Sequence, residues 1–309
     1  MEGSETSVGA RQRLGRPLGA VLLALVAACA HNSGPDPEEF VGAGFVSASS
    51  EPPPGLFAPV PMGDLAATAE RGRMLSAMER ALTLAVAEMQ RVGAAPAEIV
   101  LPIVDVDPGL RSGQVLFVRG PVGASEEGPR AANLERWLLV SLMLEPERVI
   151  DVELLSGGAL DPDSALAERV ERMLVAARAL PQAGPSFHLF SVQEQVAEEK
   201  PAVGKRVVTR VYALAGDPSG PDYELVVERP RRAKTPEVTA STLVHAAGIF
   251  TRDPVMLDLP GPAPATVTRV LRRPAHAGDV LVENTAGLRW SISTRDGRIS
   301  RTVEAEASY

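Results

Sequence analysis

The segment DPDSALAERVERMLVAARAL, residues 161–180, has the periodicity of an amphipathic helix and stands between two series of alternating segments. Asp163 or Ser164 can cap the start of this helix, and Pro181 ends it. The apolar stripe on one face consists of Leu166, Val170, Met173, Leu174 and Ala177. A helix at this position indicates that an order of elements is repeated along the chain.

Strand-like segments follow this helix. They read SFHLFSVQEQV, KRVVTRVYAL and DYELVVERP, at residues 186–196, 205–214 and 222–230. The same order occurs earlier in the chain, where Asp64 precedes a helical pattern at residues 65–92. Alternating segments come after that helix as well, at residues 98–106, 114–120, 136–144 and 148–155. A helix followed by antiparallel strands is therefore expected twice.

A third and fainter copy begins at TASTLVHAAGIF, residues 239–250. Strands are expected after it at residues 266–272, 279–284, 287–294 and 298–304, the last two forming a hairpin about Asp296-Gly297. We therefore predict an α+β fold of tandem small modules, each a helix packed on an antiparallel sheet. The predicted modules are module 1 at 64–158, module 2 at 159–238 and a β-rich module 3 at 239–309.

The N-terminal region has the layout of a secretory signal peptide, residues 1–28. Arg11, Arg13 and Arg16 precede an apolar run at 18–28, which is shorter than the roughly 20 residues that a membrane-spanning helix needs. Residues 29–63 are rich in Pro, Gly and Ser and show no sustained apolar period. This composition predicts a disordered, flexible tether.

The only cysteine of the chain, Cys29, follows Val26, Ala27 and Ala28. These four residues resemble the lipobox of bacterial lipoproteins, and the alternative is an ordinary buried or accidental cysteine. The resemblance implies that the thiol of Cys29 receives a diacylglyceryl group, that the signal is cleaved before it and that the new N-terminus is acylated. Acyl chains at this position are sufficient for stable anchoring in a lipid bilayer.

The residue after the cysteine is Ala30 rather than the Asp that favours retention in the inner membrane of enterobacteria. The resemblance therefore implies a protein of the cell envelope, anchored by lipid in the outer membrane of a Gram-negative bacterium.

Two further resemblances concern the modules. The segments FHLFSVQEQV, at 187–196, and KRVVTRVYALAGDPSGPDYELVVERPRRAKTPEV, at 205–238, are similar in layout to the cystatin-like N-terminal domains of copper amine oxidases. That resemblance covers about 75 residues of module 2. It extends more loosely to module 1. RWSISTRDGRISR, at 289–301, is similar to the end of PepSY-type domains. Both resemblances imply accessory, non-catalytic domains, and the copper-binding domain with its histidines and quinone cofactor has no counterpart here.

Composition and motifs narrow the classes of function. The formal net charge of −8 argues against nucleic acid as a partner, because nucleic-acid binding requires a basic surface. The sequence contains no GxSxG motif and no glycine-rich phosphate loop. Asp105 and Asp107 are interpreted as a strand end and turn rather than a calcium loop. His188 is expected to be a half-buried strand residue, so no metal, cofactor or catalytic residue is predicted.

One basic cluster, RPRRAK at 229–234, is either a solvated turn between modules or a patch for an acidic partner or a lipid headgroup. Its charged residues are Arg229, Arg231, Arg232 and Lys234. The two tryptophans, Trp137 and Trp290, lie in alternating segments and are expected to pack in the core or on a sheet.

The function expected from these features is that of a membrane-anchored, exported lipoprotein, a non-enzymatic interaction or scaffold protein with another envelope protein as its partner. The alternative is a binding module for a small or lipidic ligand held between helix and sheet, and an enzyme with a site between modules comes third. A concave apolar pocket with a few convergent polar groups favours the binding module. A flat apolar patch with a charged rim favours a protein partner.

Overall fold

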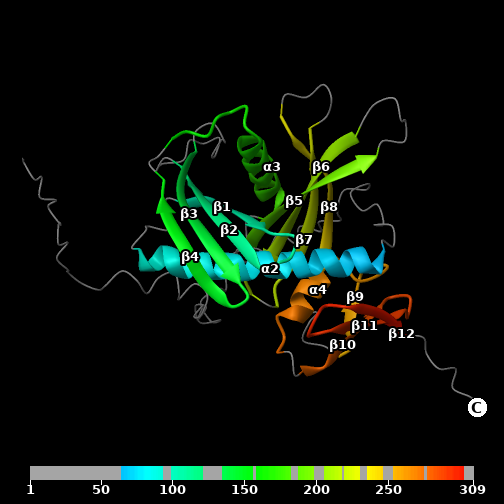
Figure 1. Cartoon of the computed structure of the whole chain (residues 1–309). Coiled ribbons are helices and arrows are strands. Elements are labelled where there is room, and N and C mark those ends of the chain that lie inside the picture. The colour runs from blue at the N-terminus through cyan, green and yellow to red at the C-terminus, as the bar shows by residue number, and fades with distance from the viewer. Residues whose placement is uncertain are drawn as a thin grey trace, which may run out of the picture. The chain divides into compact units, whose positions relative to one another are not determined.

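The computed structural model describes residues 64–92, 99–120, 134–155, 158–181, 187–197, 205–217, 219–229, 235–245, 253–274 and 277–302. These residues form three helices and three four-stranded sheets, so the predicted α+β class is confirmed (Figure 1). The predicted signal peptide and tether, with Cys29, lie outside the described residues.

The first sheet has the antiparallel order β1-β2-β3-β4. Its strands are β1 (Ile99–Val106), β2 (Ser112–Arg119), β3 (Glu135–Leu144) and β4 (Glu147–Leu154), within two residues of the predicted bounds. Helix α2 (Leu65–Arg91) packs on this sheet and begins where expected, because the carboxylate of Asp64 accepts a hydrogen bond from the backbone N–H of Ala66 at 2.9 Å.

The second sheet has the antiparallel order β5-β6-β7-β8. Its strands are β5 (Phe187–Ala197), β6 (Lys205–Ala215), β7 (Asp222–Glu228) and β8 (Glu237–His245). Helix α3 (Ala165–Ala179) packs on it, and of the two cap candidates it is Ser164 whose hydroxyl accepts from the N–H of Ala167 at 3.1 Å.

Strand β8 differs from the expectation that residues 239–250 begin a third copy. Residues 239–245 instead continue the second sheet, where Thr242 lies opposite Glu224 of β7. The physical reason is that β8 supplies hydrogen-bond partners to the edge of β7, which the three expected strands would have left open.

Both long helices bury residues of both sheets. The core around α2 contains Phe117 and Leu142 of the first sheet together with Phe190 and Tyr212 of the second. The core around α3 likewise combines residues of β1 and β2 with residues of β6 and β7. In Figure 1, α2, drawn in cyan, runs past the strands of both sheets. The two sheets are therefore held together by shared helices.

The side chain of Arg169 on α3 reinforces this arrangement. It donates hydrogen bonds to the backbone carbonyl of Val104 at 2.9 Å and to the hydroxyl of Ser191 at 2.7 Å, and so connects the edge strands β1 and β5. It also pairs with the carboxylate of Asp105 at 2.6 Å. Strands β1 and β5 belong to different sheets and form no backbone ladder with each other. The guanidinium of Arg169 therefore supplies hydrogen-bond donors to both of these edge strands.

The third sheet has the order β12-β11-β10-β9, with β9 parallel to β10 and the other pairs antiparallel. Its strands are β9 (Val255–Leu257), β10 (Asp279–Asn284), β11 (Arg289–Ser293) and β12 (Ile299–Thr302). The predicted hairpin about Asp296-Gly297 is confirmed, and Gly297 adopts a φ of +67°, a conformation that favours glycine.

The predicted strand at 266–272 is wrong, because residues Pro264–Leu271 form helix α4. The alternating β-branched residues of this stretch favour a strand. Pro264 suits the first turn of a helix, and residues 264–270 are all buried, so tertiary packing outweighs the local preference. At Gly72 of α2 the two helices approach so closely that a Cβ atom would lie 2.4 Å from the Cβ of Val267.

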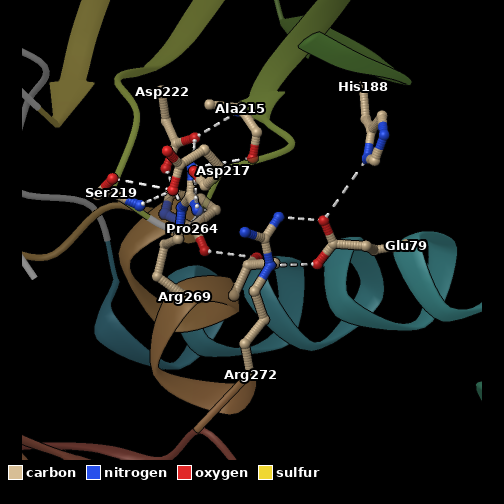
Figure 2. A network of polar contacts seen from close by, with 10 residues as sticks. Glu79, His188, Ala215, Asp217, Ser219, Asp222, Pro264, Arg269 and Arg272 are labelled. Carbon is tan, nitrogen blue, oxygen red and sulfur yellow. Dashed lines mark hydrogen bonds and ion pairs between the residues drawn. The ribbon is translucent and has the colours of Figure 1, made fainter. Parts of the chain in front are cut away.

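A buried ion pair joins α4 to the second sheet (Figure 2). The guanidinium of Arg269 contacts both carboxylate oxygens of Asp222 at 2.5 and 2.7 Å, and it donates to the backbone carbonyls of Ala215 and Asp217. Asp222 in turn accepts from the N–H of Ala215 at 2.9 Å. Because α4 follows residues 259–263 directly, this pair also positions that segment.

Candidate functional site

A chamber of about 450 Å³ lies between the first turns of α2, the second sheet and the β11–β12 hairpin. Residues 259–264, LPGPAP, which we call the proline-rich segment, form one of its walls. Other apolar lining comes from Leu65, Val244, Leu288 and Trp290, and polar lining from Asp64, Thr68, Arg71, Arg210, Glu224, Thr242 and Arg301. Its volume lies within the range of small-molecule sites.

Charged side chains form a row across the chamber side of the second sheet, which we call the charged row. Arg210 of β6 donates to Glu194 of β5 at 2.7 Å and to Glu224 of β7 at 2.5 Å. Arg71 of α2 pairs with Glu194 from the opposite side. The row therefore contains two guanidinium groups and two carboxylates in alternation, and it connects three strands with helix α2.

The two carboxylates of the charged row stabilise the positive charge of Arg210. Burial by itself would lower the pKa of Arg210, but the hydrogen bond to Glu194 and the charge of Glu224 raise this pKa above its ordinary value. Charged groups that are partly buried in this way are costly to desolvate and often mark functional sites. Here they lie beside a cavity, which makes the cavity a candidate site.

Tyr212 lies in the sheet beside the charged row, directly opposite Glu224 in the register of β6 and β7. Its side chain is fully buried, and its hydroxyl has no hydrogen-bond partner among the described residues. Burial, and then the negative charge of Glu224, raise the pKa of Tyr212 above its ordinary value, so the hydroxyl stays protonated. A buried hydroxyl without a partner costs free energy.

The hairpin contributes an aromatic residue and a cation to the chamber. Trp290 on β11 is only 2% exposed, which confirms the prediction that it packs in the core, and the residue belongs to the lining of the chamber. Arg301 lies opposite Trp290 in the hairpin register and is exposed. In the part of the chain that the structure describes, no carboxylate pairs with Arg301.

A second hollow of about 360 Å³ lies near His188 and Glu79. The prediction for His188 is confirmed, since its side chain is partly exposed on β5, with Nδ1 4.0 Å from the carboxylate of Glu79 (Figure 2). Burial alone would raise the pKa of Glu79, but the contacts with His188 and Arg272 lower it below its ordinary value. Glu79 thus serves to connect α2 with α4 through Arg272.

Only part of the predicted site residues can be placed. Cys29 and the lipobox residues Val26, Ala27 and Ala28 lie outside the described residues, as do Arg231, Arg232 and Lys234. Arg229 is described and pairs with Glu171 of α3 at 3.1 Å.

The interpretation of Asp107 as a turn residue is confirmed, because its carboxylate accepts from the N–H groups of Gly109 and Arg111. Within the described ranges, no three His, Cys, Asp or Glu side chains gather as metal ligands would.

The sequence did not reveal the chamber, because its lining comes from segments more than 200 residues apart. One feature of the strand KRVVTRVYAL, residues 205–214, does point to a polar site in the interior. Arg210 and Tyr212 occupy the same face as Leu214, the face that packs towards α2. A charged residue on the inward face of a strand indicates either a buried ion pair or a polar cavity.

No helix within the described residues is long and apolar enough to cross a membrane. Comparison with models of known protein families, with curated proteins and with solved structures gives no match.

Proposed function

We propose that this protein is an exported lipoprotein, anchored through Cys29, that binds a small ligand in the chamber. The observation that carries the proposal is the combination of an apolar wall with convergent polar groups in one cavity of about 450 Å³. This combination is typical of small-molecule sites. Among the functions expected from the sequence, the geometry thus favours the ligand-binding module.

The electrostatics of the chamber support binding rather than catalysis. Both glutamates of the charged row are held by arginine, so neither is a free base. The proline-rich segment adds stiff apolar surface that needs little ordering when a ligand binds. We therefore propose a non-enzymatic binding protein.

Tryptophan emission provides the test for the chamber. The Trp137→Phe variant has Trp290 as its only tryptophan, so its emission reports directly on the chamber. We expect a saturable change in this emission on titration with at least one of three probes, n-octanoate, 1-octanol or octylammonium, below their aggregation concentrations. A Thr242→Phe substitution fills part of the chamber and should weaken the binding by about tenfold or more.

The matched control is Thr239→Phe, which adds the same ring to the same strand at an exposed position outside the chamber. Its affinity for the probe should equal that of the parent. The proposal fails if none of the probes changes the emission, or if both phenylalanine variants bind alike.

Intact mass spectrometry of the membrane fraction tests the anchor. We expect a chain that begins at Cys29 with the added mass of acyl groups, and a Cys29→Ser variant that lacks this mass and leaves the membrane fraction. Fractionation of the envelope then tests the proposed place in the outer membrane of a Gram-negative bacterium. A free thiol at Cys29 in a protein released from the membrane contradicts the anchor.

A scaffold role with an envelope protein partner is a second candidate, favoured by strand β4. This strand is an edge of the first sheet, and its Ile150 and Leu154 are 56% and 64% exposed. Exposed edge strands with apolar side chains pair readily with a strand of another protein. The Thr242→Phe variant separates the two roles, because it changes the chamber and leaves β4 unaltered.

We also propose that the fold consists of tandem modules: the first at 64–158, the second from residue 159 to the end of β8 at His245, and the third after it. The support is that the first and second sheets share one strand order and that each follows a helix on which it packs. The resemblances to cystatin-like and PepSY-type domains imply the same accessory, non-catalytic character.

A further inference from the structure

We infer that the ligand of the chamber is a small amphipathic acid, with its anionic group bound by Arg301 and its apolar body in the part of the chamber lined by Trp290 and Leu288. This inference rests on the proposed function and specifies its ligand class. It starts from the charges of the chamber. Within the charged row, the guanidinium groups of Arg71 and Arg210 are compensated by the carboxylates of Glu194 and Glu224.

Arg301 is the lining arginine without such compensation in the described part of the chain. The remaining lining carboxylate, that of Asp64, accepts from the N–H of Ala66 at the start of α2. The partial positive charge of a helix N-terminus stabilises a carboxylate there. A ligand with one negative charge would therefore complete the electrostatics of the chamber.

The hairpin register places the two proposed contacts side by side. Trp290 and Arg301 are direct partners across β11 and β12, so their side chains project from the same face of the hairpin. Both line the chamber, together with Leu288 from the turn that precedes β11. An apolar chain or ring in the part of the chamber lined by Trp290 and Leu288 would thus lie beside Arg301, with its acidic group within reach of the guanidinium.

Arginine is well suited to this role, because its planar guanidinium binds a carboxylate through two parallel hydrogen bonds. The exposure of Arg301 allows an acid to approach from solvent without first desolvating a buried charge. The hydroxyls of Thr68 and Thr242 lie in the same lining and offer further hydrogen bonds. The chamber thus combines the features that distinguish an acid from a neutral analogue of equal length.

The test compares n-octanoate, 1-octanol and octylammonium in the Trp137→Phe protein, with the emission of Trp290 as the signal. We expect octanoate to bind about tenfold more tightly than octanol. This factor is what one charge-assisted hydrogen bond between the carboxylate and an exposed arginine contributes. An Arg301→Gln substitution should remove this preference, weakening octanoate about tenfold and leaving octanol unchanged. Arg301→Lys should retain part of the preference, since it keeps the charge but not the planar fork.

Arg298→Gln is the matched control. Arg298 lies in the same hairpin, its side chain is 82% exposed, it pairs with Asp296, and it does not line the chamber. Its octanoate affinity should equal that of the parent.

Three results overturn the inference: equal affinities for octanoate and octanol, an Arg301→Gln variant that retains the preference, or octylammonium as the tightest probe. If none of the probes binds, the proposed function itself fails, and the two failures are thereby distinguished.

Discussion

Replacing Asp222 by alanine is expected to lower the free energy of unfolding by about 3–5 kcal/mol, the usual cost of breaking a buried ion pair. Asp222 is fully buried, and the side chain of Arg269 is only 2% exposed. Without the carboxylate, the guanidinium stays in the interior, and its remaining partners among the described residues are the carbonyls of Ala215 and Asp217. The N–H of Ala215 also loses its acceptor.

Urea denaturation followed by circular dichroism measures this effect. The control is Asp217→Ala in the same turn, because the carboxylate of Asp217 is exposed and accepts hydrogen bonds from the backbone N–H and the hydroxyl of Ser219. We expect this control to cost less than about 1 kcal/mol. A double replacement, Asp222→Leu with Arg269→Met, should recover much of the lost stability, since no buried charge then lacks a partner. Equal costs for the two single alanine variants would contradict the burial of the pair.

The same substitution should affect the chamber. Arg269 holds α4 against the second sheet, and the proline-rich segment that lines the chamber leads directly into α4. Loss of the ion pair therefore releases one wall. In the Trp137→Phe background, Asp222→Ala should weaken binding of the probe that binds best, whereas Asp217→Ala should not.

Gly72→Ala is expected to lower the free energy of unfolding by about 1–3 kcal/mol, the typical cost of overpacking a core. Helix propensity alone would predict the opposite, a stabilised protein, because it favours alanine over glycine by about 1 kcal/mol. The reason is steric. The added Cβ would lie 2.4 Å from the Cβ of Val267 and 2.9 Å from the backbone oxygen of Pro264, so α4 must move away from α2. The hydrogen bond from Thr268 to the carbonyl of Gly72 depends on the same close approach.

The control for this prediction is Gly158→Ala, because a Cβ at Gly158 meets no atom within 4 Å. Its effect should stay within about 0.5 kcal/mol. Val267→Ala removes the Cγ1 atom of Val267, which would lie 2.7 Å from the added Cβ, so the cost of the double variant should be smaller than the sum of the two single costs, which a double-mutant cycle measures. A Gly72→Ala protein as stable as the parent would contradict the close packing of α2 and α4.

Local patterns in the sequence predicted much of the fold. Helix α2 begins after Asp64 and α3 after Ser164, and the strands of the first sheet end within two residues of their predicted bounds. The hairpin about Asp296-Gly297 was predicted from its turn residues. These features depend on side-chain periodicity, caps and turn conformations, all of which act between residues close in the chain. Helix α4 is the exception, because its burial on all sides outweighs its β-branched residues.

The sequence by itself thus determined the α+β class, the cap of α2, two candidates for the cap of α3, most of the strands and the resemblance of residues 26–29 to a lipobox. Only the tertiary structure decided that Arg269 reaches Asp222, that α4 lies on Gly72, and that Trp290 and Arg301 line the same chamber as Arg210 and Glu224. The physical reason is distance along the chain. A buried ion pair between residues 222 and 269, or a cavity lined from residue 64 to residue 301, leaves no periodic signal in any short window of sequence.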